Sequence, residues 1–179
     1  MPEVPVLRKL SVSHSREIGR IIVRWAHLEW RLRLIAYALL GLDQKEGRLA
    51  VRATGRVVEF VTMLQDLENA KRFDLGVDWK GLRKVLKHLS EHRGRLAHGL
   101  WLRVGRTKSP SIQIVNDVWQ PDPKKKPTRA KIDPVSAIVR ANDLNFIAQQ
   151  IDSMIDTLIE IEGRANFLRE ALLRKSHKL

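Results

Sequence analysis

Residues 18–41 read IGRIIVRWAHLEWRLRLIAYALLG, and the spacing of their apolar side chains is typical of a long amphipathic helix. The apolar positions recur every three or four residues and are Ile18, Ile21, Ile22, Trp25, Leu28, Leu32, Ile35 and Leu39. Ser13 or Ser15 suits the N-cap, because a hydroxyl accepts from a free backbone N–H, and Gly41 suits the end. The pattern predicts a helix of about six turns that buries one side.

The same spacing predicts two further helices in the first hundred residues. One runs from an N-cap at Asp43 to about Leu67, and its short connection makes it an antiparallel neighbour of the first helix. The next runs from about Trp79 to His98 and ends before Gly99. The first half of the chain therefore predicts three packed helices.

After residue 99 the apolar spacing changes from a helical period to alternation. Residues 100–119 predict a β-hairpin, and residues 134–139 predict a further short strand. A last helix, capped by Asn142 or Asp143, holds an apolar stripe for about eight turns. The expected fold is mainly α, a four-helix bundle of long amphipathic helices with a small β-hairpin inserted between helices 3 and 4.

Two segments lack any regular period. Residues 1–12 contain two prolines and are expected to form an N-terminal arm. Residues 120–133 contain three prolines and a run of positive charges, which predicts a basic loop. At 179 residues, the chain is expected to form a single domain, residues 1–179, with a substantial core.

The composition favours a polyanionic partner. The 33 basic residues exceed the 20 acidic ones, giving a net charge of +13, so nucleic acid is expected ahead of an anionic membrane surface. There is no cysteine, and the N-terminus lacks a secretory pattern. The most apolar segment, residues 21–40, is interrupted by charges, so no membrane span is expected. We expect a cytoplasmic protein whose core needs no cofactor.

Two charged residues fall on stripes that should face the core. Arg93 lies on the inward stripe of the third helix, whose other members are Leu82, Val85, Leu86, Leu89 and Leu96. Glu29 lies on or beside the stripe of the first helix. A buried guanidinium needs an anionic partner, so the two are expected to pair across the helix interface. The pair is either purely structural or a means for Glu29 to orient Arg93 toward a phosphate beside His98.

Arg93 and His98 are suited to phosphodiester chemistry but are awkwardly spaced. Five residues along an ideal helix turn through about 140°, so the two side chains cannot share one helical face. Either the last turn unwinds before Gly99, or the working site combines groups from two chains. His98 is then expected as general base or acid, and Arg93 as the group that stabilises charge on the phosphate.

The segments RGRLAHG (residues 93–99) and WAHLEWRL (residues 25–32) resemble the HEPN superfamily of small helical nucleases, whose signature is Arg, four to six residues, then His. The resemblance implies a helical bundle that dimerises so that two motifs face one cleft, with metal-independent RNA cleavage in active members. It also implies a toxin or phage-defence role and a possible antitoxin protein as partner. This sequence has Gly94 where the family often has a polar residue. The alternative is a non-catalytic helical dimer that binds RNA or a protein partner.

Three further features of the sequence are candidate sites. Residues 88–92 match the pattern His-x-x-Glu-His of certain zinc proteases, but no further acidic ligand is evident, so an exposed polar helix face is favoured. Arg95 is a candidate RNA-binding residue beside the motif. The basic loop forms either a solvated segment or an arm on RNA phosphates through Lys124, Lys125, Lys126, Arg129 and Lys131.

Overall fold

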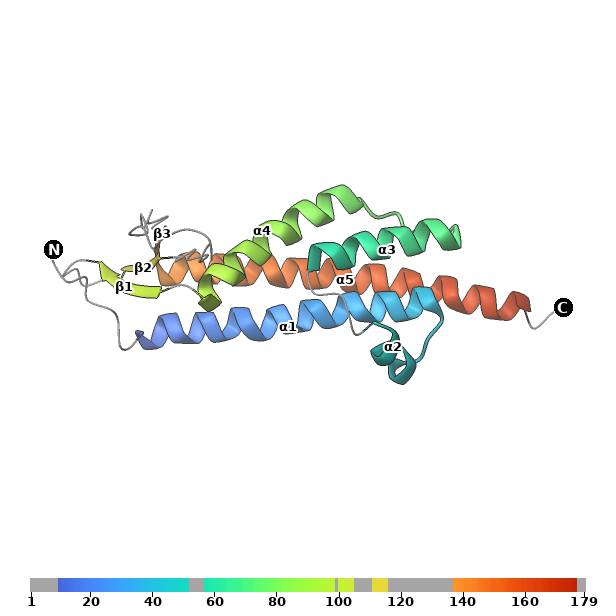
Figure 1. Ribbon diagram of the computed structural model, residues 1–179, viewed down its shortest axis with the longest axis horizontal. Helices are drawn as coiled ribbons and strands as arrows, with labels where there is room; N and C mark the ends of the chain where they lie inside the picture. The colour runs from blue at the N-terminus through green and yellow to red at the C-terminus, as the bar shows by residue number, and fades with distance from the viewer. Residues whose placement is uncertain (1–9, 52–56, 99, 105–110, 116–136, 177–179) are drawn as a thin grey trace, which may run out of the picture.

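The computed structural model describes residues 10–51, 57–98, 100–104, 111–115 and 137–176. These residues form a mainly helical fold, as predicted (Figure 1). The helices are α1 (Val12–Leu40), α2 (Gln44–Ala50), α3 (Val57–Lys71), α4 (Trp79–His98) and α5 (Ala141–Ser176). No helix among the described residues is both long and apolar enough to cross a membrane.

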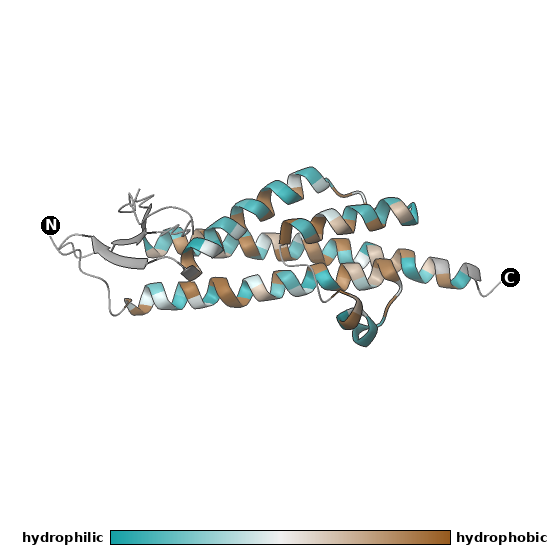
Figure 2. Ribbon diagram, viewed as in Figure 1, coloured by the Kyte–Doolittle hydropathy of each residue, from teal (hydrophilic) through white to brown (hydrophobic). Residues whose placement is uncertain are grey.

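Helix α1 is the centre of the fold. Its apolar side is buried against α5, α3 and α4, and Figure 2 shows apolar and polar residues interspersed along each long helix. The fully buried side chains include Ile21, Leu28, Leu32 and Ile35 of α1, Leu64 of α3, Leu86 and Leu89 of α4, and Leu144, Ile151 and Leu158 of α5. The predicted apolar stripe of the first helix is therefore the main source of the core.

The start of α1 differs from the prediction. The helix begins at Val12, six residues before Ile18, and its N-cap is Ser11 rather than Ser13 or Ser15. The Ser11 hydroxyl lies 2.6 Å from Nδ1 of His14, which is buried, so this cap is held by the packed side of the helix. The C-terminal end is as predicted, because Gly41 adopts the left-handed conformation, with φ of 72°.

The predicted second helix is wrong in extent and direction. It is divided into α2 and α3, and residues 52–56 between them lie outside the described residues. Val57 lies beside Trp25, near the middle of α1, and α3 then runs in the same direction as α1 (Figure 1). The chain therefore doubles back along α1 before α3 begins, and it is α4 that runs antiparallel to both.

α2 is docked against α1 by contacts of its own residues. Asp43 caps α2 in a reciprocal capping box with Glu46, as its position predicted. Gly47 lies so close to the Tyr37 ring that an added Cβ would overlap it. The guanidinium of Arg48 lies over the Trp30 ring, 5.5 Å from its centroid. These contacts dock α2 against the C-terminal half of α1.

Helices α1 and α5 lie side by side and run parallel, with polar contacts along their seam. Arg20 donates to Asn145 at 2.9 Å, Arg24 pairs with Asp152, and Arg31 pairs with Glu162 at 2.9 Å. The residue numbers of the paired side chains rise together along both helices, so the two helices run parallel. α5 begins at Ala141, so Asn142 and Asp143 lie in its first turn and neither is the N-cap. Asp143 instead accepts from the Arg140 backbone N–H at 2.7 Å.

A small antiparallel sheet lies between α4 and α5 in the chain. Its strands are β1 (Leu100–Val104), β2 (Ser111–Val115) and β3 (Ala137–Val139), in the order β1-β2-β3. Leu100 is opposite Val115 and Val104 is opposite Ser111. The sheet occupies the same end of the bundle as the start of α1 (Figure 1). The rest of the predicted hairpin, the basic loop at 120–133, and residues 1–9 of the predicted arm lie outside the described residues.

Glu68 joins α3 to the start of α4 through buried hydrogen bonds. Its carboxylate accepts from the Leu75 backbone N–H at 2.6 Å and from the Trp79 indole N–H at 2.5 Å. Glu68, Leu75 and Trp79 are all buried. The carboxylate therefore satisfies two buried donors and holds the α3–α4 connection against the core.

We expect Glu68→Ala to lower the free energy of unfolding by about 3 kcal/mol, because both buried donors lose their acceptor. Urea unfolding followed by circular dichroism measures this change. The control is Glu170→Ala, which removes an exposed carboxylate near Arg174 and should change the free energy by less than about 0.5 kcal/mol. Equal stability of the two variants would contradict the structural role of Glu68.

Candidate functional site

The inward side of α4 is apolar except at Arg93. Leu82, Leu86, Leu89 and Leu96 are buried on this side, and Arg93 occupies the next position of the same stripe. Val85, which was predicted to belong to the stripe, is 42% exposed because the helix turns it away from α1. Arg93 itself is half-buried rather than fully buried. Helix packing therefore directs this guanidinium toward α1.

The predicted ion pair between Glu29 and Arg93 is not formed. Oε1 of Glu29 accepts from the Trp25 indole N–H at 2.7 Å, since residues four apart lie on one side of α1. Among the described residues, none forms a hydrogen bond or an ion pair with the Arg93 guanidinium. Its Nε is buried without a hydrogen-bond partner. The structure thus places both charges in one region but leaves the cation unpaired.

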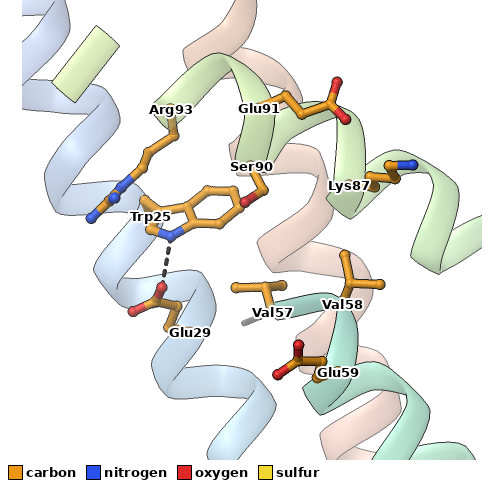
Figure 3. Close-up of a pocket in the computed structure, with 9 residues that line it drawn as sticks. All are labelled: Trp25, Glu29, Val57, Val58, Glu59, Lys87, Ser90, Glu91 and Arg93. Atoms are coloured by element: carbon orange, nitrogen blue, oxygen red, sulfur yellow. Dashed lines mark hydrogen bonds between the residues drawn. The ribbon is translucent and has the colours of Figure 1, made fainter. Parts of the chain in front are cut away.

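Glu29 and Arg93 line a pocket between α1, α3 and α4 with a volume of about 460 Å³. Trp25, Val57, Val58 and Ser90 supply its inner surface, and the exposed residues Glu59, Lys87 and Glu91 supply its rim. Figure 3 shows the Arg93 side chain reaching from α4 to the edge of the Trp25 indole, with Glu29 on the next turn of α1. The volume falls in the range of small-molecule sites, roughly 300 to 1,000 Å³.

Helix α4 remains regular through His98. Its range, Trp79–His98, is the predicted one, so the last turn does not unwind before residue 99. At about 100° per residue, Arg93 and His98 therefore leave the helix axis about 140° apart. Of the two alternatives left by the sequence, unwinding of the last turn is not seen in the described helix. Gly94, between them, would have no atom within 4 Å of an added Cβ.

His88 and His92 pair with one another on the outer side of α4. Their Nε2 atoms lie 3.0 Å apart, and the rings meet edge to face. The described residues contain no group of three or more His, Cys, Asp or Glu side chains arranged to hold a metal ion. The His-x-x-Glu-His pattern thus brings its two imidazoles together but adds no third ligand from the described part of the chain.

The predicted RNA-binding residues are only partly described. Arg95 is exposed on α4, two residues from Arg93. Lys124, Lys125, Lys126, Arg129 and Lys131 lie outside the described residues. The structure adds Val57, Val58 and Ser90, which sequence reasoning did not connect with Arg93. The i, i+4 spacing of Trp25 and Glu29 was the one available signal for this pocket.

Comparison of the chain with protein-family models, with curated proteins and with solved structures finds no match. Function is therefore inferred from the residues and their geometry alone.

The His88–His92 pair makes stability depend on pH. Burial lowers the pKa of His92 below its usual 6.5, and the charges of His88 and Arg95 lower it further, against a smaller opposite effect of Glu91. As pH falls, the unfolded chain takes up this proton before the folded chain does. The contribution of neutral His92 to the free energy of unfolding is therefore fully present above pH 6.5 and is lost as pH falls below that value.

We expect the melting temperature to decrease between about pH 7.5 and pH 5.5, with a smaller decrease in His92→Gln. Differential scanning fluorimetry across this range measures the slope. His27→Gln is the matched control, because His27 is an exposed α1 histidine that only accepts from Arg31 at 3.3 Å. If His27→Gln reduces the slope of melting temperature against pH as much as His92→Gln does, His92 is not the group responsible for the slope.

Proposed function

We propose that this protein is a HEPN-like, metal-independent endoribonuclease whose active site forms where two copies of the chain meet. The observation that supports this most is the unpaired guanidinium of Arg93. The ion pair with Glu29, which both the structural role and the orienting role assumed, is not formed, and Glu29 accepts from the Trp25 indole instead. A half-buried cation with no anionic partner among the described residues is a favourable site for a phosphate.

The proposed reaction is transesterification within RNA. The 2′-hydroxyl oxygen attacks the adjacent phosphorus, and His98 takes its proton as general base. The bond from phosphorus to the 5′-oxygen breaks, and that oxygen takes up a proton, leaving a 2′,3′-cyclic phosphate and a 5′-hydroxyl end. Arg93 stabilises the charge that develops on the phosphate oxygens. DNA has no 2′-hydroxyl and is not a substrate.

The proposed pairing of two copies rests on the positions of the two residues around α4. Arg93 lies on the side that faces α1, and position 98 lies about 140° further round an ideal helix. The proposed site therefore combines Arg93 of one chain with His98 of the other. Net positive charge of +13 and the exposed Arg95 favour RNA as the polyanion that enters this site.

The N-terminal half of α1 offers a surface for the second copy. Ile22 and Val23 are 43% and 70% exposed, and Gly19 has no atom within 4 Å of an added Cβ. Ile22 and Ala26 precede Glu29 by seven and three residues, so this apolar face adjoins the Arg93 pocket. Exposed apolar side chains that gather on one helix face favour association.

The second candidate function is non-catalytic binding of RNA by the same dimer. Gly94 favours it, because this position faces open space and carries none of the polar side chains that are frequent in the family's motif. This alternative predicts salt-sensitive RNA binding from which intact RNA is recovered.

We expect the purified protein to cleave mixed RNA in the presence of a chelator and to leave 2′,3′-cyclic ends. His98→Ala and Arg93→Ala should each lower the rate by at least about 100-fold, because each removes a group that acts in the transition state. Lys80→Ala, on the exposed first turn of α4, is the control and should retain the rate. Cleavage that survives both substitutions would exclude this site, and bound but intact RNA would favour the second candidate.

We also expect the double variant Ile22→Glu, Val23→Glu to separate the two copies, because it places four carboxylates at their contact. Light scattering after size exclusion should show the mass decreasing toward that of one chain, 20.6 kDa, with loss of RNA cleavage. Phe167→Glu changes an equally exposed residue of α5 and should leave the mass unchanged. A wild-type protein that is already monomeric would contradict the composite site.

A further inference from the structure

The lining of the pocket beside Arg93 suits a flat polar ligand better than a phosphate alone. Val57 and Val58 supply apolar surface on the α3 side, while Ser90 and Glu29 supply hydrogen-bonding groups from the two facing helices (Figure 3). Its volume of about 460 Å³ exceeds what a single phosphate group needs. Apolar walls with a few fixed polar groups are typical of sites that bind small organic ligands.

Glu29 is the polar group whose position is fixed. The Trp25 indole N–H donates to Oε1 at 2.7 Å, and Trp25 is itself only 3% exposed, so the core holds this donor in place. A carboxylate accepts about four hydrogen bonds, so Oε2 and a remaining site on Oε1 stay available. The two oxygens together form a fork that matches two parallel N–H donors.

Among the RNA bases, guanine matches this fork. Its N1–H and one N2–H point the same way and lie side by side, so both can donate to one carboxylate. Adenine and cytosine present an amino group beside a ring acceptor, which would face the second carboxylate oxygen unfavourably. Uracil presents a single N–H between two carbonyl groups. A fixed carboxylate therefore selects guanine over the other three bases.

The position of Arg93 connects this pocket with the backbone of RNA. Its guanidinium lies at the edge of the same cavity and has no hydrogen bond or ion pair with a described residue. A phosphate held there would place the base of an adjoining nucleotide next to Glu29. We propose that the pocket between α1, α3 and α4 recognises a guanine base beside the phosphate bound by Arg93, an inference that rests on the proposed function for its place in RNA cleavage.

The affinity of the protein for single nucleotides tests the guanine assignment independently of RNA cleavage. Isothermal titration of the intact protein in chelator compares guanosine 3′-monophosphate with the adenosine, cytidine and uridine monophosphates. We expect guanosine monophosphate to bind at least about tenfold more tightly, as a bidentate contact requires. Equal affinity for the four nucleotides, or no binding of any, would overturn the assignment.

Glu29→Gln is the informative variant. The glutamine carbonyl can still accept from the Trp25 indole, so the fold is retained, but the amide N–H₂ faces a guanine donor. We expect the guanine preference to decrease to within about threefold, with little change for the other nucleotides. Glu160→Gln, at an exposed carboxylate of α5 near Arg164, is the matched control and should keep the preference. A preference that survives Glu29→Gln would also overturn the assignment.

Filling the cavity provides a second test. Ser90→Trp should abolish binding of all four nucleotides while the circular dichroism spectrum stays helical, because Ser90 lines the pocket and is only half-buried. Unchanged nucleotide binding in a folded Ser90→Trp protein would place the ligand elsewhere. RNA cleavage without a guanine preference would contradict guanine recognition by the pocket but not the proposed nuclease activity. Guanine-selective binding without cleavage would support guanine recognition but contradict the proposed nuclease activity.

Discussion

The burial of the apolar side of α1 is the interaction on which the rest of the structure depends. α1 contacts α2, α3, α4 and α5, and its Leu28, Leu32 and Ile35 have almost no exposed surface. Each such side chain contributes roughly 1.5 to 3 kcal/mol when buried. The polar seam with α5, where Arg24 meets Asp152 and Arg31 meets Glu162, adds little stability, since these groups remain partly exposed. Arg20 also lies 3.6 Å from Asp152, so two arginines one turn apart share this carboxylate.

The candidate site is a consequence of this packing. α4 buries four leucines against the bundle, and the helical period then obliges Arg93 to face inward as well. Arg93 is half-buried there, and its buried Nε has no hydrogen-bond partner, which is unfavourable for a charged group. Such a residue is typical of a site where binding, rather than stability, determines the side chain. The open pocket beside it gives an anionic ligand access to the guanidinium.

The same helix geometry connects the proposals for catalysis and specificity. A regular α4 separates positions 93 and 98 around the helix axis, and the proposed site therefore takes Arg93 and His98 from different chains. Glu29 is held by the Trp25 indole and does not pair with Arg93, and in the second proposal its carboxylate binds a guanine base. The exposed apolar face of α1 lies next to both groups, so the contact between chains, the phosphate and the base pocket would occupy one continuous region.

The sequence by itself determined the helical class of the fold, the end of α1 at Gly41, the capping of α2 by Asp43 and the full extent of α4. These features are local, because they depend on apolar periods and on single capping residues. It also placed Arg93 on a core-facing stripe. Only the tertiary structure decided the break between α2 and α3, the parallel run of α3 along α1, and the lack of an ion pair between Glu29 and Arg93. The first two go with contacts between elements that no local pattern encodes, such as Gly47 against Tyr37 and Val57 beside Trp25. The third depends on how α4 packs against α1, whereas the hydrogen bond from Trp25 to Glu29 is local, since the two residues are four apart on one helix.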